Sequence, residues 1–257
     1  MAFNRPSDLR RRGAPVSPVF LGLVGVAVAG GALTLVTSRI AVTAGIVVLV
    51  LAGWAVSLCL HEFAHALVVH RGGDRMVRAR GYLTLDIRRY TNVGLTFVLP
   101  VLFLLLGGIP LPGGAVWIDH GAIRSRAVRS LVSLAGPTVN LVCGLALTVL
   151  VATVPMPIGL AAGLSCLALI EVLAFVLNIL PVPGLDGFGV LEPYLSDGAR
   201  RLADRVRPWA PFVLLALLLG APGVSGALFG LGDALFTALG GDGGLADAGR
   251  GALLFWR

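Results

Sequence analysis

The stretch 40-IAVTAGIVVLVLAGWAVSLCL-60 carries no charged residue and leads directly into 61-HEFAH-65. A helix needs about 20 consecutive apolar residues to cross a bilayer, and residues 40–60 meet that length. The sequence therefore predicts a membrane-spanning helix that ends in two histidines and a glutamate. Ionisable side chains in such a position are costly and usually face a polar interior, so they indicate a functional site.

The composition of the whole chain also indicates a membrane protein. Of its 257 residues, 57% are hydrophobic and only 13% are charged, whereas soluble domains are about half apolar and a quarter charged. The formal charge of +7 would suit a nucleic-acid-binding protein, but the arginines form short clusters between apolar runs, without interleaved aromatic residues. That pattern fits membrane orientation better, so we expect no nucleic-acid partner. Cys59, Cys143 and Cys166 lie in apolar runs, which predicts small buried hydrophobic residues.

The positions of the basic clusters predict an orientation. An uncharged run at residues 19–38 follows a polar, arginine-containing segment. A signal peptide has the same pattern, but this run is long and other apolar runs follow, so we expect a retained first helix. A second basic cluster occupies residues 71–89. Because cytoplasmic loops carry excess positive charge, both clusters are predicted to be cytoplasmic, which places the histidine motif near the cytoplasmic end of the second helix.

The later apolar segments are of several kinds. Alternation in 82-YLTLDI-87 predicts a strand. Residues 91–118 are uncharged but interrupted by prolines and glycines, which favours a re-entrant loop or hairpin. Residues 130–170 are too long for one helix and predict two, joined by a turn at 155-PMP-157. Residues 209–232 predict a last span.

Together these segments predict an all-α polytopic membrane protein with about five transmembrane helices plus a small β-hairpin or re-entrant element. The predicted divisions are a cytoplasmic N-terminal segment at 1–18, a transmembrane domain at 19–232 and a Gly- and Asp-rich C-terminal tail at 233–257. Glu171 lies inside one predicted span. It is either a functional acid or a residue that is neutral or hydrogen-bonded to a neighbouring helix, and the sequence leaves both open.

The motif residues suit metal chemistry. On a helix, His61 and His65 share one face and can bind one metal ion, with Glu62 placed to take a proton from a metal-bound water. A catalytic zinc needs a third protein ligand, and the best candidate is Asp186 in 178-NILPVPGLDGFG-189. This aspartate follows a helix end at the same predicted cytoplasmic side, and Gly187 would let the backbone turn tightly behind it. Taken alone, Asp186 is better explained as an ordinary loop residue.

These paired motifs, with 135-AGPTVN-140 between them, resemble the site-2 protease family of intramembrane zinc metalloproteases. The resemblance covers residues 40–195, in a minimal core form without a PDZ domain. It implies a zinc ion held by His61, His65 and Asp186, with Glu62 as the catalytic acid and base. It also implies that Asn178 helps to hold the substrate strand, whereas Asn140 is structural or substrate-facing.

The chain departs from the family pattern near Asp186. It has Gly184 where many members have proline, and Phe188 and Gly189 where they have a Gly-Arg pair. The implied catalytic side chains are unaffected, so these departures bear on the substrate or the subgroup.

The resemblance implies an intramembrane zinc metalloendopeptidase of a bacterial-type plasma membrane, with the N-terminus and the active site toward the cytoplasm. Its substrates would be transmembrane proteins, cleaved near the cytoplasmic side after local unwinding, and residues 82–87 could pair with the unwound strand by edge addition. The alternative is a catalytically inactive relative that acts as a membrane-bound regulatory or binding protein, although such a protein has no need for Glu62. A transporter is less well supported, because no pair of matching broken helices occurs in two halves of the chain.

Overall fold

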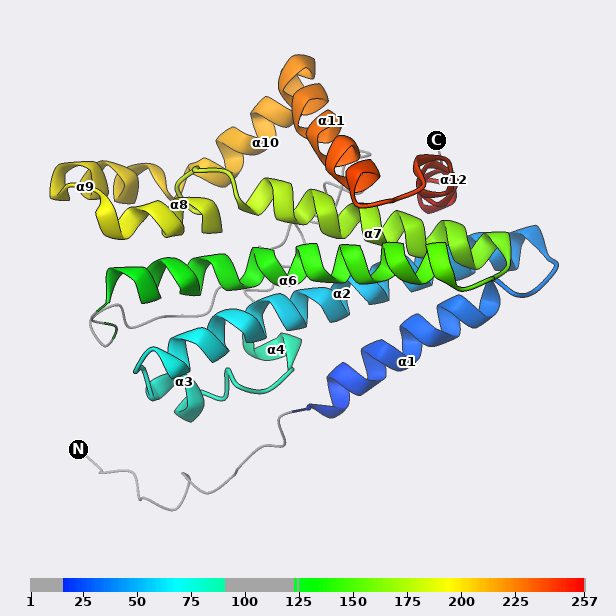
Figure 1. The fold of residues 1–257 in the computed structure, drawn as a ribbon, viewed down its shortest axis with the longest axis horizontal. Helices are drawn as coiled ribbons and strands as arrows, with labels where there is room; N and C mark the ends of the chain where they lie inside the picture. The colour runs from blue at the N-terminus through cyan, green and yellow to red at the C-terminus, as the bar shows by residue number, and fades with distance from the viewer. Residues whose placement is uncertain (1–15, 91–122, 124, 257) are drawn as a thin grey trace.

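A computed structural model describes residues 16–90, 123 and 125–256, and over these residues the chain is helical, with connecting turns (Figure 1). The predicted re-entrant segment at 91–118 and most of the N-terminal segment lie outside the described residues. The elements in chain order are α1 (Pro18–Leu33), α2 (Arg39–Arg71), α3 (Met76–Ala79), α4 (Ile87–Tyr90), α6 (Arg126–Thr153), α7 (Ile158–Asn178), α8 (Asp186–Leu191), the 3-10 turn η3 (Glu192–Tyr194), α9 (Asp197–Val206), α10 (Ala210–Gly220), α11 (Pro222–Ala238) and α12 (Gly243–Leu253).

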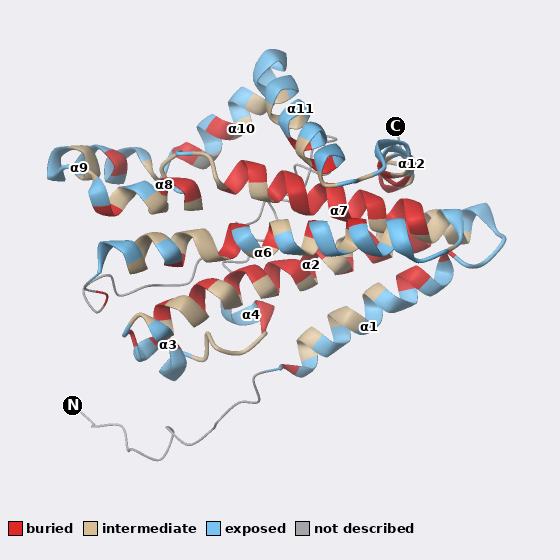
Figure 2. Ribbon diagram, viewed as in Figure 1, coloured by how far each residue is buried: buried red, intermediate tan, exposed pale blue. Residues whose placement is uncertain are grey.

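The helices α2, α6 and α7 pack together as the centre of the molecule, with α1 along the outer side of α2. In its most apolar window α7 is 83% buried, against 39% for α2 and 28% for α6. Figure 2 shows the same contrast, since α7 is buried on most of its length and α1 is largely exposed. An apolar helix buried on all sides is a core helix, whereas the exposed apolar faces of α2 and α6 suit contact with lipid.

Small residues bring α1 and α2 into backbone contact. A Cβ added to Gly30 would lie 2.5 Å from the backbone nitrogen of Leu49, and one added to Gly45 would lie 2.7 Å from the carbonyl oxygen of Gly30. Close approach through glycine is a common way for membrane helices to associate, because lipid removes the hydrophobic drive between them. At the start of α1, Ser17 accepts a hydrogen bond from the Phe20 backbone nitrogen (3.0 Å) and donates one to the Leu85 carbonyl (2.6 Å).

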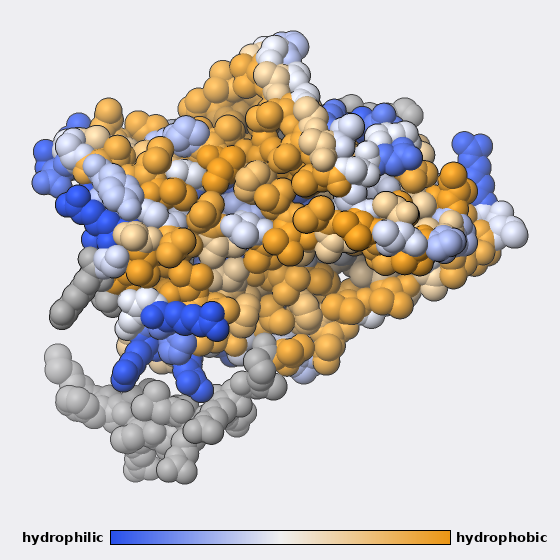
Figure 3. Space-filling model, in the orientation of Figure 1, coloured by the Kyte–Doolittle hydropathy of each residue, from blue (hydrophilic) through white to orange (hydrophobic). Residues whose placement is uncertain are grey.

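The structure supports an integral membrane protein with three or four spans among the described residues. The helices α2, α6 and α7 are each long and apolar enough to cross a bilayer. With 16 residues, α1 is shorter, about 24 Å against a hydrocarbon core of about 30 Å. The prediction of two helices joined at 155-PMP-157 is confirmed by α6 and α7. Figure 3 shows hydrophobic surface over much of the visible face, with hydrophilic side chains gathered at the end that carries α3 and α9.

The predicted last span at 209–232 is wrong as a single straight helix. The chain bends by 96° between α10 and α11, at Ala221. Pro222 explains the break, since proline has no backbone N–H to continue the hydrogen bonds of the preceding helix. The two halves make a fourth span only if a broken helix is counted as one.

The predicted strand at 82–87 is also wrong. Leu85 forms an isolated bridge with Val16, and no other bridge involves the described residues. The short helix α4 begins at Ile87 instead, where the buried carboxylate of Asp86 accepts hydrogen bonds from the backbone nitrogen (3.1 Å) and the guanidinium of Arg88. A capping aspartate of this kind favours a turn over a strand, so the alternation in 82-YLTLDI-87 reflects side chains packed in a turn. Edge addition of substrate to this segment loses its basis.

Residues 233–256 complete α11 and form α12. Figure 1 places α12 beside the first half of α7. A Cβ added to Gly249 would lie 2.2 Å from the carbonyl oxygen of Ala162, and Ala246 is fully buried. This part of the chain therefore covers α7, which helps to explain why that helix is buried on nearly all sides.

Candidate metal centre

Two histidines on successive turns of α2 point their Nε2 atoms at each other. His61 and His65 are 3% and 7% exposed, and their Nε2 atoms lie 3.1 Å apart. The other ring nitrogens are both engaged, His61 Nδ1 with Asn140 Oδ1 and His65 Nδ1 with the Val132 carbonyl, each at 2.6 Å. Because both partners are acceptors, each Nδ1 carries the proton, and both Nε2 atoms present lone pairs.

The helix α2 continues beyond this pair, whereas the sequence predicts that the helix ends at the motif. It continues from the apolar run through the motif to Arg71 and is 33 residues long. The histidines therefore lie in the interior of the helix instead of at its end. At about 1.5 Å per residue, His61 lies about 33 Å from Arg39 and about 15 Å from Arg71.

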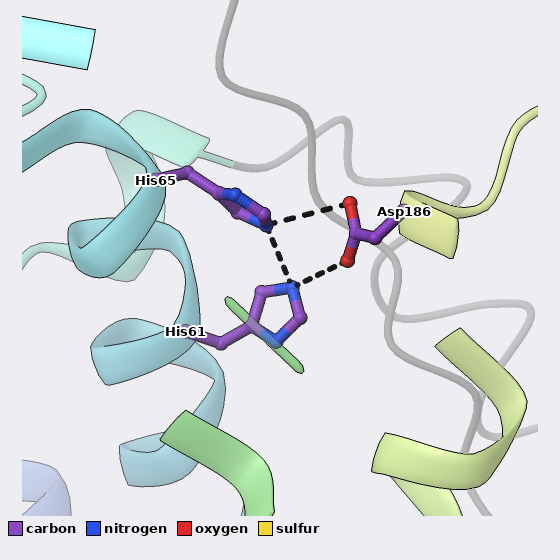
Figure 4. Close-up of side chains that lie close together, drawn as sticks. All are labelled: His61, His65 and Asp186. Atoms are coloured by element: carbon purple, nitrogen blue, oxygen red, sulfur yellow. Dashed lines mark hydrogen bonds and ion pairs between the residues drawn. The ribbon is translucent and has the colours of Figure 1, made fainter. Parts of the chain in front are cut away.

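Asp186 faces the histidine pair from α8, as Figure 4 shows. One carboxylate oxygen lies 3.2 Å from His61 Nε2 and the other lies 3.5 Å from His65 Nε2. The side chain is 25% exposed, so solvent reaches the site on the aspartate side. The structure thus brings together the three residues that the sequence proposed as metal ligands, from segments more than a hundred positions apart.

Two glycines explain the position of Asp186, with different roles. Gly184 has a φ of +100°, a left-handed conformation that favours glycine, and it turns the chain after α7. Gly187 has no positive φ; instead, a Cβ there would lie 2.1 Å from the carbonyl oxygen of Ile179. The start of α8 therefore packs directly on the end of α7, and this contact, not a tight turn at Gly187, fixes Asp186 beside the histidines.

The donor set fits a tetrahedral zinc ion. Zinc bonds of about 2.0–2.1 Å to nitrogen and oxygen imply donor atoms about 3.3 Å apart. The two Nε2 atoms lie 3.1 Å apart, close to that value, and the carboxylate approaches them with one oxygen 3.2 Å from His61 and the other 3.5 Å from His65. The three side chains also form the one metal-ligand cluster found among the described residues.

Gly136 on α6 leaves the space that such an ion requires. A Cβ added there would lie 2.3 Å from His65 Nε2 and 2.5 Å from His61 Nε2. These separations are close to metal–nitrogen bond lengths and far too short for a carbon atom. The sequence analysis did not assign this residue, although it belongs to the quoted 135-AGPTVN-140.

Charge at the site favours cation binding. The lone pairs of both Nε2 atoms face the Asp186 carboxylate oxygens at 3.2 and 3.5 Å with no hydrogen between them, and a cation in that space would relieve their repulsion. Glu62 is 3% exposed and close enough to interact electrostatically with both histidines and with Asp186. The centre therefore has two neutral nitrogen donors, one ionised carboxylate ligand and a second buried acid beside them.

Asn140 and Glu171 are linked to the centre by hydrogen bonds. Asn140, 4% exposed on α6, holds His61 as described, and its Nδ2 donates to Glu171 Oε2 at 2.7 Å. Ser57 on α2 donates to the same carboxylate oxygen. Of the two explanations that the sequence left open for Glu171, the hydrogen bond to neighbouring helices is confirmed. Ser57 was not predicted, although its place four residues before His61 puts both on one face of α2.

Asn178 and Cys59 do not belong to the donor cluster. Asn178 is the last residue of α7, is 5% exposed, and its Nδ2 has no hydrogen-bond partner. Cys59 is fully buried in an apolar cluster with Leu58 and Trp54. The prediction of buried cysteines is therefore confirmed for Cys59 and Cys166, whereas Cys143 is only half-buried.

Comparison with known proteins gives the chain a family. No protein-family model matches it, and no solved structure does. It is 46% identical over 254 residues to the "Putative zinc metalloprotease Rip2" of Mycobacterium tuberculosis (strain ATCC 25618 / H37Rv), which covers 96% of each chain. It is 41% identical over 251 residues to the protein of the same name from Mycolicibacterium smegmatis, again over 96% of each. The "Putative zinc metalloprotease YwhC" of Bacillus subtilis (strain 168) is 29% identical over 178 residues, 64% of this chain and 77% of that protein. With these relatives and a His-His-Asp centre between membrane helices, the chain belongs to the site-2 protease family of zinc metalloproteases.

Proposed function

We propose that the chain is an intramembrane zinc metalloendopeptidase that hydrolyses peptide bonds of membrane-embedded protein substrates near the cytoplasmic side. The observation that carries this proposal is the convergence of His61, His65 and Asp186 next to the buried Glu62. A zinc site that serves only structure is closed by four protein ligands, whereas a catalytic site keeps an open position. Three donors with an adjacent acid suit the catalytic type.

Each side chain has a role in this mechanism. His61, His65 and Asp186 hold the zinc ion. When bound, zinc supplies Lewis acidity, which polarises a carbonyl group and makes water a better nucleophile at neutral pH. Glu62 accepts the proton of the attacking water and delivers it to the leaving amine. The unpartnered Nδ2 of Asn178 is a donor available to a backbone carbonyl of the substrate, since buried amides are normally hydrogen-bonded.

The distribution of arginines supports an active site toward the cytoplasm of a bacterial-type plasma membrane. The end of the bundle that carries α3 and α9 holds many arginines, whereas the turn between α6 and α7 has none. By the positive-inside rule, the first end is cytoplasmic. If Arg39 lies at the opposite surface, His61 lies about 33 Å away, near the cytoplasmic edge of a core about 30 Å thick. We also propose that α1 crosses the membrane and returns the chain to α2, despite its short length.

The substitution Glu62→Gln tests the function. We expect the purified full-length variant to retain zinc and to cleave a co-expressed single-span substrate about 10²- to 10⁴-fold more slowly, because proton transfer is lost. Glu192→Gln is the matched control, since Glu192 pairs with Arg207 and does not belong to the metal-ligand cluster. Unchanged cleavage by a zinc-loaded Glu62→Gln chain would refute the protease mechanism. A wild-type chain that binds zinc but cleaves nothing would favour the inactive regulatory relative.

A further inference from the structure

A buried acid at the centre of the bundle is not explained by the mechanism above. Glu171 on α7 is 0% exposed and lies against α2 and α6. A carboxyl group in such a place is expensive, and an apolar residue would fill the same space without that cost. Its contacts are specific, since its Oε2 accepts from Ser57 of α2 and from Asn140 of α6.

These contacts continue to the metal centre. Asn140 Nδ2 lies 2.7 Å from Glu171 Oε2 and 3.3 Å from Ser57 Oγ, and Asn140 Oδ1 lies 2.6 Å from His61 Nδ1. A hydrogen-bonded path therefore runs from Glu171 through one amide group to one metal ligand. It joins the three long helices of the bundle at a single point.

The chemistry of the path sets its direction. In the structure the atom of Asn140 that faces Glu171 Oε2 is the donor nitrogen, and Ser57 donates to the same oxygen. The amide oxygen then faces His61, which must carry its proton on Nδ1. In that tautomer Nε2 has the free lone pair that a metal requires. A reversed amide would offer a donor to Nδ1 and favour the proton on Nε2, where it blocks the metal.

We propose that Glu171 is a positioning residue that acts through Asn140 to hold His61 in the tautomer and orientation that bind zinc. The inference rests on the proposed function, because it requires His61 to be a zinc ligand. Glu171 itself touches neither the ion nor the substrate. Outer partners of metal-binding histidines often change metal affinity about 10- to 100-fold when they are removed.

Two substitutions at Glu171 separate this role from a packing role. Glu171→Met keeps similar bulk but offers Asn140 no oxygen, whereas Glu171→Gln keeps an oxygen that can accept from Asn140 Nδ2. The dissociation constant for zinc is measured by competition with a chelating dye on the full chain in detergent or nanodiscs. We expect about a tenfold rise for the methionine variant and less than about threefold for glutamine. The absorption spectrum of bound Co²⁺ is expected to change in the methionine variant only.

The control is Thr148→Val on α6. Thr148 is 5% exposed, and its hydroxyl bonds to the Gly144 carbonyl of its own helix. This change removes a buried polar group without touching the path, so zinc affinity and the Co²⁺ spectrum should stay as in wild type. If Glu171 served only packing, the methionine variant would lose thermal stability but bind zinc as the wild type does once folded. That result would overturn the proposal.

A swap of functional groups keeps the test decisive if Glu171→Met does not fold. In the double variant Asn140→Asp with Glu171→Gln, the new amide can donate to the new carboxylate, which can still accept from His61 Nδ1. We expect its zinc dissociation constant to lie within about threefold of wild type and below that of Asn140→Asp alone. A double variant that binds zinc about tenfold or more weaker than wild type overturns the proposal. A wild-type chain that binds no zinc overturns the proposed function as well, so the two failures are distinguishable.

Discussion

The substitution Gly136→Ala should remove metal binding from a chain that still folds. The added methyl carbon would lie 2.3 Å from His65 Nε2 and 2.5 Å from His61 Nε2. A favourable contact between such atoms needs about 3.5 Å, so the rings and the methyl group must separate by about 1 Å. Metal–ligand lengths tolerate only about 0.2 Å, and the methyl group also occupies the space of the ion.

The expected effect on zinc binding is large. We expect the dissociation constant for zinc to rise at least about 100-fold, which corresponds to about 2.7 kcal/mol of binding free energy. The metal-free protein should change less. Overpacking costs about 1–3 kcal/mol, whereas alanine gains about 1 kcal/mol over glycine as a helix former. The assay is chelator competition for zinc, combined with thermal unfolding of the full chain with and without zinc.

Two other glycines serve as controls. Gly163→Ala on α7 would place its Cβ 2.9 Å from Leu49 Cδ2, which perturbs the packing of α7 on α2 but not the centre. Gly226→Ala on α11 meets nothing within 4 Å. Both should bind zinc as the wild type does. The reasoning is refuted if Gly136→Ala binds zinc with a dissociation constant within about threefold of wild type, because the space beside this glycine would then not be the metal site.

Three further predictions follow from the geometry. Removal of zinc with a chelator should abolish cleavage and lower the thermal unfolding temperature, because an ion at about 100 times its dissociation constant stabilises the folded state by about 2.7 kcal/mol. Added zinc should restore both the cleavage and the unfolding temperature. An unchanged unfolding temperature would show that no ion joins α2 to α8. Gly187→Ala should destabilise the fold by about 1–3 kcal/mol and weaken zinc binding, because its Cβ would meet the Ile179 carbonyl oxygen at 2.1 Å. Gly198→Ala, whose Cβ would lie 4.0 Å from the nearest atom, should change neither the unfolding temperature nor zinc binding. The hydrogen bond from Arg88 holds the pKa of Asp86 below its usual value, so the stability that Asp86 contributes is fully present above the unfolded-state pKa and is lost as the pH falls through the folded-state pKa. The Asp86→Asn variant should therefore lose less stability than the wild type as the pH is lowered. Identical dependence of unfolding on acid pH in the two proteins would contradict this prediction.

Some features of the molecule could be predicted because they depend on local sequence. The helices α2, α6 and α7 follow from uncharged runs bounded by arginines and prolines, since a bilayer imposes length and apolarity directly. The pairing of His61 with His65 follows from the period of a helix. Asp186 was chosen by its resemblance to a family motif as much as by its chemistry.

Other predictions were wrong where one residue outweighs the pattern of its segment. The alternation at 82–87 suggested a strand, but a buried Asp86 that caps α4 turns the segment into a helix start. The apolar run at 209–232 is long enough for one span, yet Pro222 breaks it into two helices at 96°. The length of an apolar run indicates that a segment avoids water. It does not indicate whether the segment crosses the lipid as one straight helix.

By itself, the sequence determined the membrane class, the main helices and the donor types of the metal centre, because hydrophobic length and helical spacing are properties of neighbouring residues. Only the tertiary structure decided that Gly136 leaves room between two Nε2 atoms, that Gly187 seats α8 on the end of α7, and that Glu171 reaches His61 through Asn140. These are contacts of a few ångströms between different helices, and two of the three join helices far apart in the chain. Such contacts depend on how the helices pack, which no local pattern encodes.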